Sequence, residues 1–321
     1  MELIVERDGI WVDALQKFSL DMAQGDENDF ELTYDGEIQN NSFVFVPGTS
    51  YGGIVDGVSI DADASSFMRK YYGRTWEGIL QTSIIQPPSG QDYYIVSGDL
   101  YAVLRRIIER QGLAYAFEIP NGSYGLTVAY QFERYTNAYA GICKMLESVG
   151  LVPRFSKDEG LCVISVERPR TFENDGFDDY RFEISITDIR ATNHLICLGG
   201  GELRNRLVRH LYMDANGNIS TNQTQFGINE VQDVYDYPSA ETEQDLIDGG
   251  KDVLADRYAQ SKNCAVNVAE GYEYKIGDVV TSISANAGYQ VTASITKTIL
   301  TMDEVSAQVA YEVGAITSKA R

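Results

Sequence analysis

The chain has 321 residues, of which 44% are hydrophobic, enough for about two domains with buried cores. Its formal net charge of −21 argues against a protein that grips DNA, because Lys and Arg side chains supply most of the affinity for phosphates. The sequence contains neither a membrane-spanning apolar run nor a secretory signal segment, so we expect a soluble protein without a membrane span that is made in the cytosol.

Residues 1–96 are predicted to form a first β domain. Apolar and polar side chains alternate in the segments 18–22, 30–34 and 54–60, as they do in strands that bury one face. The Pro-Pro-Ser-Gly sequence at 87–90 interrupts this pattern. We therefore place a domain boundary shortly after it.

Residues 97–168 are predicted to form a small α+β domain that begins with a helix. Ser97 is expected to cap this helix, with Asp99 in its first turn, and Gly112 is expected to end it. The buried stripe of the helix is expected to contain Leu100, Val103, Leu104, Ile107 and Ile108. The opposite face is charged, and we interpret it as a solvated surface rather than a binding patch. Its residues are Arg105, Arg106, Glu109 and Arg110.

A hairpin, a second helix and a second hairpin are expected to complete this domain. The first hairpin should join 115–119 to 126–132 through a turn at Asn121-Gly122. The second helix should span about 137–149, and the second hairpin should span 151–167. The buried side of the second helix is expected to contain Tyr139, Cys143, Leu146 and Val149.

Residues 169–182 are polar and charged and are predicted to be a linker. Its acidic residues resemble a catalytic carboxylate pair, but such pairs act only inside a cleft that tunes their pKa values. We therefore interpret the segment as a solvated loop. The acidic residues are Glu173, Asp175, Asp178 and Asp179.

Residues 183–321 are predicted to form a second β domain. Its later strands are expected at 264–268, 279–284, 289–300 and 308–313. One inserted helix is expected at about 238–261, because a proline and several acids near its start suit a helix N-terminus. Its buried stripe should contain Leu246, Ile247, Val253, Leu254 and Tyr258. A weak internal repeat of strand, turn and strand relates 54–72 to 279–295.

The stretch Leu198–Tyr212 separates the two halves of the chain and begins with the glycine run Gly199–Gly201. A glycine run can cradle a phosphate, but no Gly-Lys-Ser/Thr sequence follows, and a strand rather than a helix is expected next. We therefore interpret the glycines as a bend between strands.

The turn after this stretch has some features of a calcium loop. Asp214, Asn216 and Asn218 have the alternating spacing of an EF-hand. However, Ile219 and Gln225 occupy the positions at which that loop needs Gly and Glu. A hairpin turn at Asn216-Gly217 is therefore predicted.

Cysteine and histidine supply little material for a metal or catalytic centre. His194 and His210 are the only histidines, both on predicted strands, and each is interpreted as structural. The cysteines lie far apart without metal-ligand spacing and are expected to be buried free thiols. They are Cys143, Cys162, Cys197 and Cys264. No catalytic, metal-binding or cofactor-binding residue is therefore predicted, and we expect that the chain is not an enzyme.

Several segments carry motifs whose order and spacing are informative together. They are Tyr72–Leu80, Ile85–Tyr93 leading into Val96–Gly98, Asn193-His194, Gly200–Leu203, Tyr235–Tyr237 and Tyr274–Val279. In this order and spacing they resemble the tail hub proteins of phages of Gram-positive bacteria. The resemblance extends from about residue 50 to the C-terminus.

The resemblance implies a mainly β fold similar to the baseplate hub of contractile tails. Each chain would have two tube-like β-barrel domains, at 1–96 and 183–321, a small helix-hairpin-helix-hairpin insert at 97–168, and one inserted helix. A homotrimer would form a pseudo-sixfold ring that continues the tail tube at the tail tip or baseplate of the virion. An acidic channel would let DNA pass during ejection without binding it.

The implied partners are other tail proteins. They are a distal tail or tail-tube protein, a tip, fibre or receptor-binding protein, and the tape measure protein. No specific nucleic-acid binding and no cofactor are implied, and the resemblance leaves the residues of the oligomer interface and the lumen unassigned. The residues do not separate contractile from non-contractile tails, or a phage from a phage-derived particle.

Two other functions stay open on the sequence alone. The first is a tail-associated cell-wall hydrolase, which lysis of cell walls by the purified chain would reveal. The second is a host-surface carbohydrate-binding module, which would need a cluster of exposed aromatic side chains. Trp11 and Trp76 lie in strand or turn contexts, and both are interpreted as structural.

Overall fold

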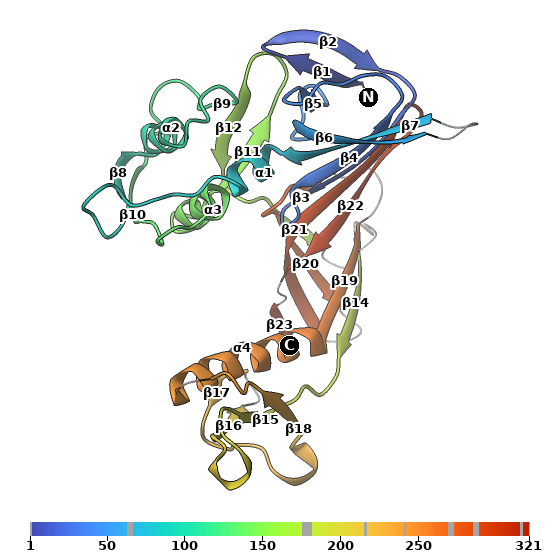
Figure 1. Cartoon of the computed structure of the whole chain (residues 1–321). Coiled ribbons are helices and arrows are strands. Elements are labelled where there is room, and N and C mark those ends of the chain that lie inside the picture. Colours follow the sequence, from blue (N-terminus) through green and yellow to red (C-terminus); the bar gives the residue numbers. More distant parts are fainter. Residues whose placement is uncertain are drawn as a thin grey trace. The chain divides into compact units, whose positions relative to one another are not determined.

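The computed structural model describes residues 2–62, 67–174, 182–214, 217–240, 242–268, 273–284, 289–314 and 317–320. The chain divides into two compact units, coloured along the sequence in Figure 1. The larger unit combines Met1–Arg181 with Val268–Arg321, and the smaller unit is Phe182–Asn267. The described elements confirm the mainly β class. The described strands form open sheets without a closed barrel.

The larger unit is built on one sheet of 12 described strands. Their order is β13 (Thr171–Asn174), β20 (Val279–Ser284), β21 (Tyr289–Asp303), β3 (Phe18–Gln24), β4 (Asp29–Tyr34), β7 (Phe67–Thr75), β6 (Gly52–Ala62), β5 (Phe43–Phe45), β1 (Leu3–Arg7) and β2 (Ile10–Leu15). Two further strands also pair with β21, namely β22 (Ala307–Val313) and β23 (Thr317–Ala320).

The long strand β21 joins the N-terminal and C-terminal parts of this sheet. Its first half pairs with β20 through Tyr289–Ser294, and its second half pairs with β3 through Thr298–Asp303. In Figure 1 the blue strand β3 accordingly runs beside the red C-terminal strands. Strands from both predicted β domains therefore share one sheet.

One face of the sheet encloses a hydrophobic core. The predicted alternation in β3 is confirmed, because Phe18, Leu20 and Met22 are buried while the residues between them are exposed. Side chains from strands that are distant in the sheet order reach the same core, since Leu3 of β1 is fully buried in it and Val309 of β22 packs against it. The sheet is therefore strongly curled.

The first predicted helix of the insert is confirmed as α2 (Leu100–Arg110), whose predicted apolar stripe is fully buried. Its N-cap differs from the prediction. The Asp99 side chain accepts hydrogen bonds from the backbone N–H groups of Tyr101 and Ala102, and Ser97 lies in the preceding strand β8 (Ile95–Asp99). Gly112 follows the helix with φ +70°, as expected for a C-terminal glycine.

The hairpin predicted for 115–132 is wrong. β9 (Phe117–Glu118) pairs in parallel with β12 (Cys162–Glu167), whereas β10 (Thr127–Gln131) pairs with β8. The Asp99 carboxylate explains the difference. It accepts hydrogen bonds from the Ser123 hydroxyl at 2.6 Å and from two backbone N–H groups of the same loop. These bonds hold the loop after the predicted Asn-Gly turn at the start of α2. These hydrogen bonds lower the pKa of Asp99 to about 2, and the bond from Ser123 has the largest effect.

Two helices complete this part of the larger unit, and β11 (Val152–Ser156) forms the predicted second hairpin with β12. Residues Trp76–Gln81 form α1, a helix inside the region predicted to be only β structure. The predicted second helix is α3 (Ala138–Glu147). It buries Ala138, Gly141, Ile142, Met145 and Leu146, so of the predicted face Leu146 is buried, whereas Tyr139, Cys143 and Val149 are only partly buried. Apolar side chains lie on most sides of α3 itself, so its sequence contains more than one candidate for the buried stripe.

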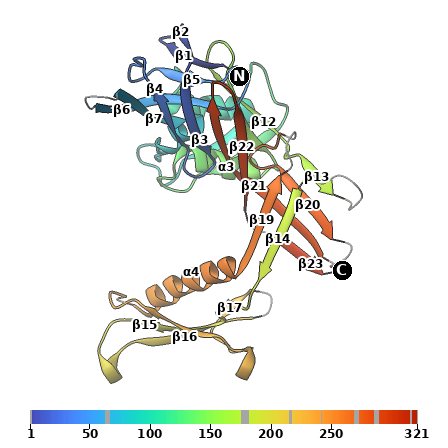
Figure 2. The same ribbon diagram turned by 90° about the vertical axis from the view of Figure 1, so that its right-hand side faces the viewer.

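The smaller unit packs one helix on a four-stranded sheet, as Figure 2 shows. The sheet order is β17 (Ile219–Ser220), β16 (Val208–Met213), β15 (His194–Leu198) and β18 (Gln232–Asp236). A separate pair consists of β14 (Phe182–Asp188) and β19 (Lys262–Val268). Short 3-10 turns occur at Leu203–Asn205 and Gly227–Asn229.

The helix of the smaller unit is α4 (Glu243–Ser261), which begins later than the predicted start at Pro238. Thr242 and Asp245 form a reciprocal cap, because the Asp245 N–H donates to the Thr242 hydroxyl and the Thr242 N–H donates to the Asp245 carboxylate, both at 3.1 Å. The predicted stripe is confirmed, with Leu246 and Leu254 fully buried and the others packed against them. None of the described helices is long and apolar enough to span a membrane.

Candidate functional site

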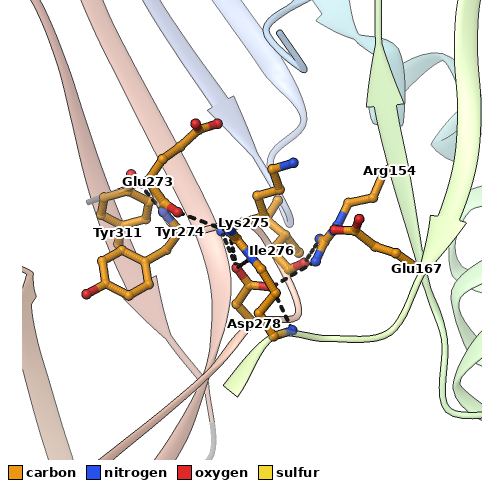
Figure 3. Close-up of polar contacts among 9 residues, drawn as sticks. Arg154, Glu167, Glu273, Tyr274, Lys275, Ile276, Asp278 and Tyr311 are labelled. Carbon is orange, nitrogen blue, oxygen red and sulfur yellow. Dashed lines mark hydrogen bonds and ion pairs between the residues drawn. The ribbon is translucent and has the colours of Figure 1, made fainter. Parts of the chain in front are cut away.

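The larger unit contains a buried ion cluster around Asp278, drawn in Figure 3. Asp278 lies just before β20 and is fully buried. Its Oδ1 accepts hydrogen bonds from the Arg154 guanidinium at 2.8 Å and from the Arg170 backbone N–H at 3.2 Å. Its Oδ2 accepts from the Arg170 Nε at 3.0 Å and from the Lys275 backbone N–H at 2.9 Å. The carboxylate therefore has charged and neutral donors on both oxygens.

This cluster connects two segments near the end of the insert to a C-terminal segment that lies more than 100 residues further along the sequence. Arg154 belongs to β11, Arg170 precedes β13, and Asp278 precedes β20. Arg154 also donates to Glu167 at 2.5 Å and to the backbone carbonyl of Ile276. A buried carboxylate is costly unless it is paired and hydrogen-bonded, so these contacts hold the insert to the C-terminal strands.

A cavity of about 690 Å³ lies beside the cluster, within the larger unit. It is lined by residues of β3 and α1, of α3 and β11, and of the C-terminal strands. Its volume is within the range of small-molecule sites. The charged residues of its lining are Asp26, Glu77, Glu147, Arg154, Glu273 and Lys275.

Glu77 is the buried acid of this cavity. It is the second residue of α1 and is 3% exposed. The Gln24 side-chain amide lies 3.3 Å from each of its carboxylate oxygens. Burial raises the pKa of Glu77 to about 7, and the hydrogen bonds from Thr75 and Gln24 only partly oppose this effect.

We expect Glu77 to make the larger unit less stable as the pH rises. Its pKa of about 7 in the folded state exceeds the ordinary value of 4.5, so the stabilisation is complete below pH 4.5 and is lost as the pH rises through 7. Glu77→Gln should remove this loss and gain about 2.5 kcal/mol relative to wild type between pH 5 and pH 8. Urea unfolding at both pH values measures the difference. An equal pH dependence in both proteins would contradict it.

Two other side chains of the cavity, the Cys143 thiol and the Tyr139 phenol, stay neutral at physiological pH. Burial raises the pKa of the Cys143 thiol to about 12, and the negative charge of Glu77 adds to the increase. The same two causes raise the pKa of Tyr139 well above its ordinary value. A thiol with such a pKa is a poor nucleophile. Cys143 is therefore not suited to covalent catalysis.

The edges of the large sheet form a second feature of interest. Among the described strands, β2 pairs only with β1, and β22 pairs only with β21. Ile10, Trp11 and Val12 are consecutive residues of β2 with exposed fractions of 69%, 63% and 60%. Trp76, in contrast, is fully buried. Trp76 therefore belongs to the core, and Trp11 lies in a strand, as expected, but at an exposed edge of the sheet.

The glycine run at 199–201 forms the predicted bend. The Gly199 N–H donates to the Leu207 carbonyl at 2.7 Å, and the Leu207 N–H donates to the Gly200 carbonyl at 2.9 Å. The predicted hairpin after β16 is confirmed by its pairing with β17. Asp214 accepts hydrogen bonds from the Asn218 backbone and side chain at 2.9 Å, and Asn216 lies outside the described residues. These hydrogen bonds stabilise the turn.

The two histidines meet on the sheet of the smaller unit. The Nδ1 of His194 lies 2.6 Å from the Glu230 carboxylate, and its Nε2 lies 2.7 Å from the Nδ1 of His210. Burial, together with the neighbouring His194, lowers the pKa of His210. Among the described residues, no group of three or more His, Cys, Asp or Glu side chains is arranged to hold a metal ion.

The remaining candidate residues have structural surroundings where they are described. Arg105, Arg106 and Arg110 donate to backbone carbonyls of Pro120, Ser97 and Gln86. Cys143, Cys162 and Cys197 are free thiols. The first part of the predicted linker is not a loop, because 171–174 forms β13 and pairs in parallel with β20. Asp175, Asp178 and Asp179 lie outside the described residues, as do the side chains of Glu173 and Cys264.

No family model matches the chain, and no curated protein matches it. Solved structures that align with it include a tail protein from Neisseria meningitidis, with 14% identity, a TM-score of 0.49, and coverage of 97% of this chain and 95% of that chain. A prophage tail protein from Shewanella oneidensis has 14% identity, a TM-score of 0.49 and 98% coverage of both chains. A prophage tail protein from Listeria monocytogenes has 16% identity, a TM-score of 0.45, and coverage of 93% and 90%.

All three aligned structures are described as tail proteins. Their TM-scores lie below 0.5, so the alignments by themselves assign neither a fold nor a function to this chain.

Proposed function

We propose that this chain is a structural, non-catalytic phage tail hub protein, three copies of which form a ring that continues the tail tube at the tail tip or baseplate. The observation that carries the proposal is the open sheet of the larger unit, whose edge strand β2 exposes Ile10, Trp11 and Val12. Soluble proteins usually protect or charge such an edge. An apolar one favours pairing with another chain.

A closed ring would protect the two edges formed by β2 and β22 at once. If β2 of one copy pairs with β22 of the next, the contact is of the head-to-tail kind that forms rings when its rotation closes. The sequence resemblance supplies the number of copies. In this arrangement, 1–96 and 183–321 would each contribute a tube-like barrel, with 97–168 inserted between them and 169–182 as the connection.

The segments that carry the resemblance have structural surroundings, which supports a structural role. Tyr72–Leu80 supplies the end of β7 and most of α1, including the buried Trp76. Tyr274–Val279 supplies the loop that holds Asp278 in the ion cluster. The net charge of −21 supports a channel that repels DNA, because like charges keep the duplex from adhering. A trimer with a basic or closed lumen would contradict this part.

Further tail proteins would complete the assembly. A distal tail or tail-tube protein would bind on one side of the ring, and a tip, fibre or receptor-binding protein on the other. The tape measure protein would end near the channel. The proposed location is therefore the virion, after synthesis in the host cytoplasm.

We expect Trp11→Asp to prevent self-assembly. The wild-type chain of 35.7 kDa should have the mass of a trimer at high protein concentration (3 × 35.7 = 107.1 kDa). A charge in the middle of the apolar edge should weaken association by at least about tenfold, because the carboxylate would be buried without a partner. Native mass spectrometry or light scattering measures both proteins over a range of concentrations.

Leu203→Asp is the matched control, since Leu203 is 95% exposed in the smaller unit and lies outside the sheet edges. This variant should remain trimeric. A wild-type dimer, or a Trp11→Asp protein that remains trimeric, would contradict the proposed edge. If the wild type is a monomer at every concentration, self-assembly of the chain alone is excluded, and the next measurement adds the neighbouring tail protein.

A further inference from the structure

The charges around the cavity of the larger unit do not balance. Arg154 is already held by Glu167 and Asp278, and Asp26 lies 3.5 Å from the Lys297 ammonium. Among the described residues, Glu77 forms no ion pair although it is only 3% exposed. Of the charged side chains in the lining, Glu77, Glu147 and Glu273 thus remain opposite the single cation Lys275.

The rest of the lining suits an alkyl chain that carries a positive charge. Tyr51, Tyr139 and Tyr274 line the cavity, and the faces of aromatic rings attract cations. Apolar side chains, including Leu151 and Ile295, line it as well. A volume of about 690 Å³ exceeds what a few ordered waters need, and a carboxylate in so buried a place is stabilised by a cationic ligand.

We propose that this cavity binds a ligand with an alkylammonium group, which forms an ion pair with Glu77 while its methylene groups contact the aromatic and apolar lining. The ammonium donates hydrogen bonds to the Glu77 carboxylate and takes the place that no described cation fills. The group belongs either to a free di- or polyamine or to a lysine side chain of another protein. This inference does not depend on the proposed ring.

The test uses 1,4-diaminobutane as the probe and 1,4-butanediol, of similar shape and no charge, as the control ligand. Isothermal calorimetry on the full chain at pH 8 should detect binding of the diamine and none of the diol. Because the carboxylate must be ionised and its pKa is about 7, affinity for the diamine should fall about tenfold between pH 8 and pH 6. Equal binding of both ligands would overturn the proposal.

Two variants locate the binding site. Glu77→Gln keeps the size of the side chain and removes its charge, so it should weaken diamine binding at least tenfold. Glu109→Gln changes an exposed acid of the same unit outside the cavity lining and should alter affinity less than threefold. Absence of binding to wild type at millimolar diamine, or an unchanged affinity in Glu77→Gln, would overturn the proposal. The pH dependence of wild type provides a test that needs no variant.

A second measurement distinguishes the two sources of the ammonium group. Native mass spectrometry of the chain as purified should show an added small amine if the ligand is a free polyamine. If the ligand is a lysine side chain, no mass should be added, and Nα-acetyllysine amide should bind in a Glu77-dependent manner. Failure of both amines to bind would exclude either source.

Discussion

Replacement of Asp278 by alanine should destabilise the larger unit by about 3–5 kcal/mol. The fully buried carboxylate neutralises two guanidinium groups, and its removal leaves Arg154, whose side chain is 10% exposed, without its buried partner. The backbone N–H of Lys275 also loses its acceptor. Urea unfolding followed by tryptophan fluorescence measures this unit alone, because the only tryptophans are at positions 11 and 76.

Asp56→Ala is the matched control for this prediction. Asp56 accepts two hydrogen bonds of 2.7 Å from Arg74, but each of the two side chains is 36% exposed. Exposed ion pairs contribute about 1 kcal/mol or less, so this variant should unfold close to wild type. A similar small change in both variants would show that the cluster at Asp278 does not hold the insert to the sheet.

Trp76→Ala should have an effect of similar size, about 3–5 kcal/mol. The indole is fully buried, with its ring centre 5.5 Å from that of Phe43 and 6.2 Å from that of Phe117. It thereby connects strand β5 of the sheet to strand β9 of the insert. Far-UV circular dichroism during urea unfolding measures the loss, since the variant lacks the buried fluorophore.

Trp76→Phe separates packing from hydrogen bonding. The indole Nε1 is buried without a hydrogen-bond partner among the described residues, so Trp76→Phe should lose packing contacts only. It should therefore retain more than half of the stability that Trp76→Ala loses. Tyr115→Ala, at an aromatic side chain that is 59% exposed in the insert, should change stability by less than about 0.5 kcal/mol. Equal losses at 76 and 115 would contradict the role of Trp76 in the core.

Local patterns of the sequence predict much of the fold. The stripe of α2 repeats at helical spacing and is buried as expected, and the alternation in β3 defines its buried face. Such patterns predict secondary structure and buried faces correctly where these are determined by residues close together in the sequence. They do not work for the 115–132 hairpin, because its Asn-Gly turn is preceded by Pro120, which has no N–H to donate, and followed by a loop held by Asp99.

The ion cluster and the cavity could not be predicted in the same way. Arg154 and Arg170 lie 124 and 108 residues away from Asp278 in the sequence, and no local pattern pairs them with it. The sequence did hold one signal for the cavity, namely Glu77 among the apolar residues Trp76, Ile79 and Leu80 at a helix start. An acid in such surroundings indicates a buried carboxylate, but the sequence does not show what lies opposite it.

The smaller unit is inserted in the sequence between the two segments of the larger unit. Its first and last strands, β14 and β19, pair with each other, and the Ile189 N–H just beyond β14 donates to the Ser261 carbonyl just before β19 at 3.1 Å. The two strands at which the chain enters and leaves the smaller unit are therefore bonded to each other. Residues can be gained or lost inside the smaller unit without changing the strand register of the larger unit. Evolution can thus exchange the smaller unit while the strand pairing of the larger unit is kept.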